Sequence, residues 1–339
     1  MRITFLCPHV RIAGGVRAIL TYADRLAGRG HRVTVLVPAD GRFRAIGQRL
    51  RAARPDWFPN FRARIEWTGK WSSAWLPAGD VIVATSWQSA PVVAAAEPQA
   101  GRKFYLVQHY ESLYHGIATT VDATYRLPLQ PIAISTWLRD VLYERFGPLA
   151  EVLVTPVDRA LFHPVAVDPK TPRPRVLMLH HDYAWKGVAD GLDAVAHVKK
   201  AVPSLHLIGF GLKPPRDRAS YDEFHENPPQ DRLASLYSSA DIYLCPSWDE
   251  GLGMPPMEAM ACGAALVTYD NGGCRDYAHD GETALLARRR DVDDLAAKLE
   301  QMVRDPALRR KLAAAGQKLV TTAFDWDAAV ERLEKLFRG

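Results

Sequence analysis

The sequence predicts an α/β protein with two doubly wound parallel sheets, and three observations lead to this fold class. Apolar runs of strand length recur along the chain and alternate with segments whose apolar residues have helical spacing. Residues 162–175 contain four prolines and no periodicity, which is typical of a linker between two series of such runs. A length of 339 residues also favours two domains over one. We therefore expect one domain over residues 1–165, a second over residues 166–320, and a C-terminal helical segment over residues 321–339.

The first series opens with a strand–helix–strand unit. Strands are expected at residues 3–7 and 32–36, and the intervening residues 15–29 carry apolar side chains such as Val16 and Ile19 at helical spacing. Such units build parallel sheets, because the helix returns the chain to the same end of the sheet. The remaining strands of this series are expected at residues 81–84, 103–107, 131–134 and 151–154.

The second series is expected to form strands at residues 176–179, 205–208, 241–245, 265–268 and 284–286. An amphipathic helix follows over residues 325–337, and we expect it near the junction of the two domains. In doubly wound folds ligands bind beyond the carboxyl ends of the strands. Two such domains should therefore enclose an interdomain cleft, and functional motifs should follow strands.

The positive charge of the chain is concentrated in one segment. The net charge is +5, and residues 41–64 contain seven arginines and a single acid, Asp56, interleaved with Trp57, Phe58 and Phe61. Such a segment fits contact with anionic lipid headgroups or with a phosphorylated acceptor. An arginine-rich solvated surface explains it equally well. Contact with nucleic acid is a further alternative, although we expect no nucleic-acid partner.

Composition also limits the cellular context and the cofactors. No apolar run approaches the roughly 20 residues of a membrane-spanning helix, and the N-terminus lacks the layout of a signal peptide. The four cysteines show no metal-binding spacing and are expected to be reduced thiols of the core. We therefore expect a cytoplasmic protein, placed at the inner face of the cell membrane if the basic segment binds lipid, with no cofactor and no metal.

The motif with the most chemical content spans residues 246–263, where a strand ends in a loop with two glycines and then opens into a helix. Glycine lets backbone N–H groups approach an anion, and a helix N-terminus adds positive potential. Two carboxylates, Glu250 and Glu258, bracket this turn. Because acids would repel the anion itself, we expect them to accept hydrogen bonds from neutral hydroxyls. A ligand with both a diphosphate and hydroxyls is a nucleotide sugar.

Three weaker signals follow other strands. Gly14 and Gly15 precede the first helix and could present N–H groups to a phosphate, although Gly-Gly turns at this position are common. His109 follows the strand at 103–107 and could hydrogen-bond a sugar hydroxyl or a leaving oxygen, or it could simply cap the strand. Lys186 enters a helix after the strand at 176–179, where an ammonium group can neutralise a diphosphate. Gly209 belongs to a Gly-Phe-Gly sequence that could equally be a plain turn.

Four segments in this order, at residues 237–241, 246–263, 270–273 and 280–281, make the chain resemble the retaining glycosyltransferases of family 4. Members of that family have two Rossmann-like domains in the GT-B arrangement. The resemblance covers nearly the whole chain and is strongest between residues 235 and 286. It implies a metal-independent transfer of a sugar from a nucleoside diphosphate to an acceptor hydroxyl with the anomeric configuration kept, in polysaccharide, O-antigen or glycolipid synthesis.

The resemblance also implies roles for individual residues. Glu250 would hold hydroxyls of the donor sugar and Glu258 those of the ribose. Lys186 would bind phosphate, and His109 would lie near the reacting centre. The donor would also be bound by backbone or side-chain groups of Gly14, Gly15, His181, Gly209, Gly251, Leu252 and Gly253.

One departure from the family concerns the diphosphate. His180 and His181 stand where the family usually has Gly-Arg, so His181 or another cation would have to replace the arginine. The same architecture also occurs in other classes. A sugar-nucleotide epimerase, a phosphorylase and a scaffold that has lost catalysis therefore remain alternatives.

Overall fold

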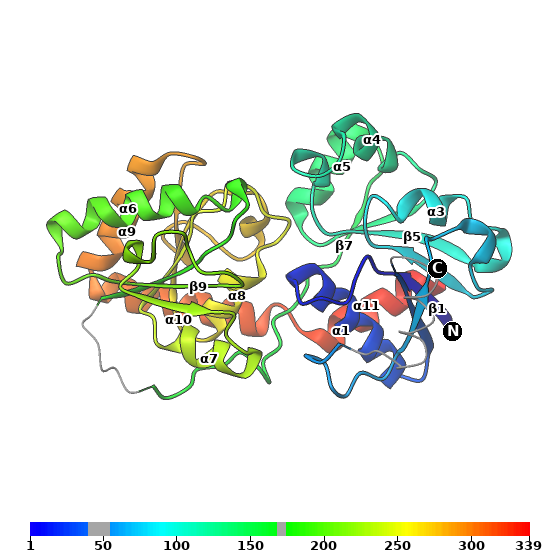
Figure 1. The fold of residues 1–339 in the computed structure, drawn as a ribbon, viewed down its shortest axis with the longest axis horizontal. Helices are drawn as coiled ribbons and strands as arrows, with labels where there is room; N and C mark the ends of the chain where they lie inside the picture. The colour runs from blue at the N-terminus through cyan, green and yellow to red at the C-terminus, as the bar shows by residue number, and fades with distance from the viewer. Residues whose placement is uncertain (40–54, 168–173) are drawn as a thin grey trace. The chain divides into compact units, whose positions relative to one another are not determined.

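The computed structural model describes residues 1–39, 55–167 and 174–339. These residues form two compact α/β units (Figure 1). The first comprises Met1–Thr155 together with Asp327–Gly339, and the second comprises Pro156–Trp326. Residues 156–165 therefore lie in the second unit, and the chain returns to the first unit for its last residues.

The described residues of the first unit form a seven-stranded parallel sheet in the order β3-β2-β1-β4-β5-β6-β7. The strand order reverses between β1 and β4, which is the switch point of a doubly wound sheet. The strands are β1 (Arg2–Leu6), β2 (Arg32–Pro38), β3 (Arg64–Thr68), β4 (Val81–Ala84), β5 (Arg102–Val107), β6 (Gln130–Ala133) and β7 (Glu151–Val152). The α-helices among the described residues of this unit are α1 (Gly14–Gly28), α3 (Ala90–Ala94), α4 (Ala118–Thr124), α5 (Thr136–Phe146) and α11 (Trp326–Arg338).

The second unit contains a six-stranded parallel sheet in the order β10-β9-β8-β11-β12-β13, with its switch point between β8 and β11. The strands are β8 (Arg175–Leu179), β9 (His206–Gly211), β10 (Glu223–Glu226), β11 (Ile242–Cys245), β12 (Ala265–Tyr269) and β13 (Ala284–Ala287). The α-helices are α6 (Val188–Ala201), α7 (Gln230–Ser238), α8 (Met254–Ala261), α9 (Val292–Arg304) and α10 (Pro306–Thr322). Two doubly wound sheets are thus confirmed.

Two edge strands, β3 and β10, were not predicted from the sequence. An edge strand needs fewer apolar residues than a central one, because one side of it is not covered by a neighbouring strand. Most residues of β3 and β10 are accordingly only half-buried or exposed. Strand β9 is also longer than predicted, with Gly209 in its interior and Gly211 as its last residue.

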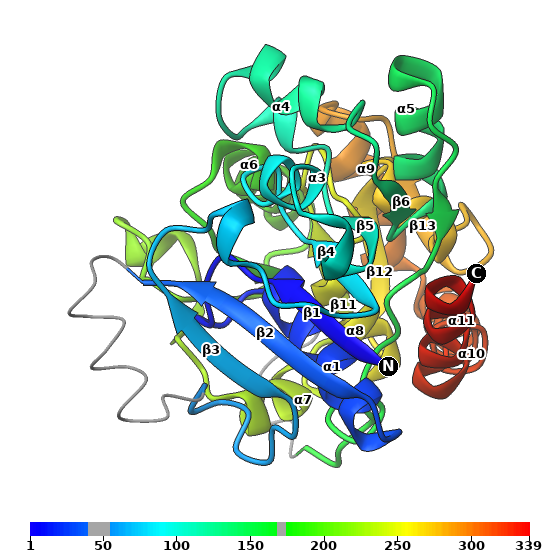
Figure 2. The same cartoon turned by 90° about the vertical axis from the view of Figure 1, so that its right-hand side faces the viewer.

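The last helix, α11, completes the core of the first unit. The ring of Phe337 packs against Phe104 and Phe5, with ring centroids 4.9 and 6.5 Å apart. Glu334, on the same helix, bonds to His31 at 2.6 Å and accepts from Arg29 at 2.8 Å. In Figure 2, the N-terminal strand β1 is blue and lies beside the N label, and α11 is red and lies beside the C label. The C-terminal residues therefore contribute to the same core as the N-terminal strand.

The basic segment predicted at residues 41–64 lies largely outside the described residues. Of the three aromatic residues named above, Phe61 is buried, and the indole N–H of Trp57 donates to the carbonyl of Val10 at 2.9 Å. Phe61 is therefore not available for the lipid or acceptor contact considered for this segment, and Trp57 is partly packed against the first unit. Within the described parts of the chain, no helix has the length and apolar character needed to span a membrane.

Candidate active site

Two loops of the second unit leave the sheet at its switch point. Strands β8 and β11 are neighbours, and the chain leaves their carboxyl ends at residues 180–187 and 246–253. Parallel strands end at the same edge of a sheet, so the side chains that follow them are brought together. Lys186 lies in the first loop and Glu250 in the second.

Lys186 and Glu250 form an ion pair at this edge. The Lys186 ammonium donates to Glu250 Oε1 at 2.6 Å, and both side chains are mostly buried, with 19% and 11% of their surface exposed. They line a small pocket together with Ser247, Pro255 and Pro256. A cation and a hydrogen-bond acceptor are thus held side by side, as recognition of a ligand with both a phosphate and hydroxyls requires.

The loop that carries Glu250 has one defined backbone path. Gly253 has φ +93°, and its carbonyl accepts the hydroxyl of Tyr277 at 3.2 Å. The Glu250 N–H donates to the carbonyl of Asn271 at 3.1 Å, and the N–H of Gly273 donates to the Glu250 carbonyl at 3.2 Å. A Cβ on Gly273 would lie 2.6 Å from that carbonyl oxygen, so only glycine permits this approach.

Glu258 lies on α8, one turn after its first residues, and is 3% exposed. Its Oε2 accepts the hydroxyl of Tyr237 at 3.0 Å. Pro255 and Pro256 occupy the first turn of α8 and have no N–H. The amide donors at the start of this helix must therefore come from Met254 and from the preceding residues 251–253.

The paired histidines after β8 have separate environments. His180 Nδ1 lies 3.1 Å from the hydroxyl of Tyr221, whereas His181 Nδ1 accepts from the backbone N–H of Tyr183 at 3.1 Å. Burial and the positive charge of Lys186 lower the pKa of His181. Its imidazole is therefore neutral at pH 7 and can supply a hydrogen bond in place of the family's arginine, but no positive charge.

Gly209 and Leu252 are buried. A Cβ on Gly209 would lie 2.5 Å from the ring of Tyr221 and 2.7 Å from that of Phe224, so aromatic packing accounts for this glycine. Leu252 is 2% exposed and belongs to the hydrophobic core. Among the described residues, no group of three or more His, Cys, Asp or Glu side chains is arranged to hold a metal ion.

In the first unit, Gly14 and Gly15 open α1 after the loop of residues 7–13 that follows β1. The N-cap residue Ala13 gives no side-chain hydrogen bond to this helix end, and the first turn contains no acid. A Cβ on Gly15 would lie 3.2 Å from the amide group of Gln108. His109 follows Gln108 at the carboxyl end of β5, is half-buried, and meets the ring of Tyr114 at 6.0 Å.

Glu111, two residues after His109, was not singled out from the sequence. Its carboxylate accepts the N–H of Trp87 at 2.9 Å and the hydroxyl of Tyr105 at 3.4 Å, while its own N–H donates to Tyr125 at 3.0 Å. Burial raises its pKa to about 7, against the opposing effect of these hydrogen bonds. This carboxyl group therefore ties the loops after β4 and β5 together.

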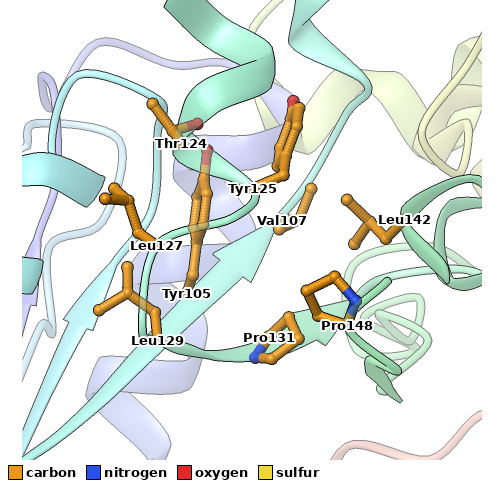
Figure 3. A pocket seen from close by; sticks show the side chains of 9 residues that line it. All are labelled: Tyr105, Val107, Thr124, Tyr125, Leu127, Leu129, Pro131, Leu142 and Pro148. Atoms are coloured by element: carbon orange, nitrogen blue, oxygen red, sulfur yellow. The ribbon is translucent and has the colours of Figure 1, made fainter. Parts of the chain in front are cut away.

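Figure 3 shows the rings of Tyr105 and Tyr125 beside an apolar pocket next to this contact. The two rings are stacked, with centroids 5.9 Å apart. The cavity measures about 10 Å³, which holds about one water molecule at most. It is therefore a packing feature of the first unit and no ligand site.

A second group that sequence reasoning missed surrounds Trp248, just before Glu250. Its N–H donates to the carbonyl of Trp185 at 2.8 Å, and its indole N–H donates to Asp190 at 2.8 Å. Arg290 lies 4.0 Å from the centre of the indole ring and has φ +61°, which is rare for a residue other than glycine. Arg289 pairs with the neighbouring, buried Asp249 at 2.5 Å. These contacts link the loop of Lys186 to the loop of Glu250.

The sequence comparisons agree with this geometry. Residues 163–319 match the family model described as Glycosyl transferases group 1. This segment belongs to the group 1 glycosyltransferase family. Its matched residues include Lys186, Glu250 and Glu258, which the resemblance had assigned to the donor site.

Relatives of the chain are named for glycan synthesis. The chain is 30% identical to the O-antigen biosynthesis protein RfbC of Myxococcus xanthus over 77% of this chain and 21% of that protein. It is 27% identical to a glycogen synthase of Mycobacterium tuberculosis over 78% of this chain and 66% of that protein. A phosphatidyl-myo-inositol mannosyltransferase of Mycobacterium tuberculosis is 28% identical over 99% of this chain and 96% of that protein. The chain thus spans about a fifth of the first relative and about two thirds of the second.

Solved structures share the fold at low sequence identity. A sucrose-phosphate synthase from Thermosynechococcus elongatus has a TM-score of 0.79 and 17% identity, covering 99% of this chain and 98% of that one. Anabaena Alr3699/HepE in complex with UDP-glucose has a TM-score of 0.80 and 18% identity, covering 100% and 99%. The chain therefore has the GT-B fold.

Proposed function

We propose that this protein is a retaining glycosyltransferase that transfers a sugar from a nucleoside-diphosphate sugar to an acceptor hydroxyl. The observation that carries the proposal is the Lys186–Glu250 pair at the switch point of the second sheet, with Glu258 on the helix that follows. A phosphate-binding cation and two hydroxyl-binding carboxylates match the two halves of such a donor. The names of the relatives support an acceptor in cell-surface glycan or glycolipid synthesis.

In the proposed reaction, the bond between the anomeric carbon and the β-phosphate oxygen breaks, and the acceptor oxygen bonds to that carbon on the same face. The acceptor proton passes to the departing phosphate oxygen. Lys186 and the amides of residues 251–253 stabilise the negative charge that grows on that oxygen, as preorganised donors do. Because these groups can replace a divalent ion, we propose that the reaction needs no metal.

Each carboxylate has one role in this proposal. Glu250 accepts hydrogen bonds from hydroxyls of the donor sugar. This becomes possible when the Lys186 ammonium also donates to the donor phosphate. Glu258 accepts the ribose hydroxyls and is oriented by Tyr237. In the first unit, the N–H groups of Gly14 and Gly15 bind the diphosphate, and His109 hydrogen-bonds the reacting sugar.

The test measures nucleoside diphosphate release from a panel of donors with and without a pooled acceptor extract. UDP-glucose is tested first because Anabaena Alr3699/HepE, which shares the fold, has been solved in complex with it. Release that needs the acceptor, an α-linked product from an α-linked donor, and full activity in EDTA are expected. An epimerase would convert the donor without acceptor, and a phosphorylase would need inorganic phosphate. Absence of both binding and turnover with every donor would refute the proposal.

We also propose peripheral contact with anionic membranes through residues 41–64. The support is the local excess of arginine in the sequence. Co-sedimentation with phosphatidylglycerol vesicles should fall when the arginines between residues 42 and 54 are replaced by glutamine. Unchanged co-sedimentation would contradict this contact.

A further inference from the structure

The first unit contains a second cavity, of about 430 Å³, at the end of the sheet where the strands begin. Gly14 and His109 lie at the opposite end, where the strands finish. It lies at the amino ends of β1, β2 and β3, whose first residues are Arg2, Arg32 and Arg64. Its volume is within the usual range for sites that bind small molecules. The small pocket near Tyr105, by contrast, has room for about one water molecule at most.

Strand register gathers the basic residues of this cavity on one face of the sheet. Arg2 stands opposite Arg32, and Thr34 stands opposite Arg64. Residues two apart on a strand share a face, and partners in register share it too. Arg2, Arg32 and Arg64 therefore belong to one face, and these residues line the cavity together with Arg62.

The charged residues that line the cavity are all basic. Four arginines line the cavity, and none of its described lining residues is acidic. Arg62 is paired with Asp24 at 2.6 Å and Arg64 with Glu66 at 3.0 Å. For Arg2 and Arg32, the described part of the chain provides no ion pair, although they occupy opposite positions on adjacent strands. Because two like charges repel each other, an anion close to both guanidinium groups would be stabilised.

The Arg62 guanidinium is fixed in position by Asp24 without a ligand. Its guanidinium forms three bonds of 2.6 to 3.2 Å with the Asp24 carboxylate. It also occupies the space beside Gly28, where a Cβ would lie 2.2 Å from Nη1. A fixed guanidinium loses less entropy when it binds a ligand, and its planar fork fits the oxygens of a phosphate.

We propose that this cavity binds a phosphate-bearing anion, through Arg2 and Arg32 with Arg62 as a fixed third donor. The chemistry suits both a soluble phosphomonoester and the headgroup of an anionic lipid. The cavity is independent of the proposed glycosyl transfer, because it lies at the amino ends of strands whose carboxyl ends carry Gly14 and Gly15.

The experiment uses the full chain and two probes, glycerol 3-phosphate in solution and vesicles of phosphatidylglycerol. Thermal shift measures the first and co-sedimentation the second. The double variant Arg2→Gln/Arg32→Gln removes two cavity charges. The control Arg139→Gln/Arg332→Gln removes two exposed charges of the same unit away from the cavity. Gly28→Ala displaces the Arg62 guanidinium without changing any charge.

We expect the cavity double variant and Gly28→Ala to weaken binding about 10-fold or more, as loss of a charge-assisted contact should. The control pair should bind like the wild type. An effect on glycerol 3-phosphate assigns the site to a soluble ligand, and an effect on vesicles alone assigns it to a lipid headgroup. Absence of binding to both probes, or equal binding by the wild type and the cavity double variant, would overturn the proposal.

Discussion

Lys186 illustrates how much of the proposed chemistry depends on one side chain. Its ammonium is mostly buried and already compensates the charge of Glu250. We predict that Lys186→Ala lowers kcat/KM by roughly 10- to 1,000-fold, because a charge-assisted contact to the departing phosphate is lost. Lys199→Ala, which removes a half-buried lysine paired with Asp222 away from the switch point, is the control in the same unit. Normal turnover in the Lys186 variant would remove this residue from the site.

Glu258 should act mainly on donor affinity. A buried carboxylate accepts hydrogen bonds from two ribose hydroxyls, whereas glutamine offers one acceptor oxygen and brings an unwanted donor. We predict that Glu258→Gln raises the donor KM by about 10-fold or more with a smaller change in kcat. Tyr237→Phe, which removes only the orienting hydroxyl, should have the same pattern at lower magnitude. A fall in kcat alone would speak against ribose binding.

Glu111 predicts a pH dependence of stability. Its pKa is about 7 in the folded protein and about 4.5 in the unfolded chain, so the folded state binds the proton more tightly. The free energy of unfolding should therefore decrease as the pH rises from about 4.5 to about 7, by roughly 1–3 kcal/mol. Denaturant titrations of Glu111→Gln should lack this decrease, whereas the exposed-site control Glu144→Gln should keep it. Identical pH profiles for wild type and Glu111→Gln would contradict the prediction.

At the scale of elements, the loops after β8 and β11 pack tightly against each other. Gly187 has φ +60°, and a Cβ there would lie 1.9 Å from the carbonyl oxygen of Pro246. The two loops thus meet backbone to backbone beside Lys186, and Trp248 adds a hydrogen bond to Trp185. The Lys-Gly dipeptide is the sequence signal for this contact, although its meaning requires the position of Pro246.

We predict that Gly187→Ala destabilises the second unit by more than about 3 kcal/mol or abolishes activity. Gly281→Ala is the matched control, because Gly281 also has a positive φ, +73°, but no atom within 4 Å of its virtual Cβ. The control should cost only the backbone strain, about 1–2 kcal/mol. Similar melting temperatures for the two variants would show that the loops can separate without cost.

Central strands and the edge strands β7 and β13 were predicted within a few residues, but the edge strands β3 and β10 were not. A strand buried on both faces must be apolar throughout, so β1, β4 and β11 are visible as apolar runs. Strands β3 and β10 carry charged residues and are recognisable only once a neighbour pairs with them. Gly209 likewise needs its tertiary neighbours to be understood. Its Gly-Phe-Gly sequence is typical of a turn, but Gly209 lies inside β9 and packs under two aromatic rings.

On the scale of the whole molecule, the chain crosses between its two units twice. Residues 327–339 return to the first unit, where Phe337 is 2% exposed against Phe5 and Phe104. The sequence indicated an amphipathic helix at this position, but its partner could not be read from its pattern. An apolar stripe indicates that one face of a helix is buried, but it does not indicate which element covers that face.

We predict that Phe337→Ala lowers the free energy of unfolding of the first unit by about 3–5 kcal/mol, because it leaves a cavity between α11 and the sheet. Lys335→Ala, on the exposed side of the same helix, should change it by less than about 0.5 kcal/mol. Hydrogen exchange of the β1 and β5 amides would locate the effect in this unit. Unchanged protection in the Phe337 variant would show that the helix is dispensable for the core.

The sequence by itself determined the class of the fold, the two series of strands and the ordered motif from residue 237 to residue 281, because these features depend on local periodicity and on residues close together in the chain. Only the tertiary structure decided which groups meet. Lys186 reaches Glu250 across 64 residues, Glu111 becomes a buried carboxyl group, and four arginines from three separate segments line one cavity. Such contacts follow from strand order and register, which are fixed by packing across the sheets and leave no trace in any short stretch of sequence.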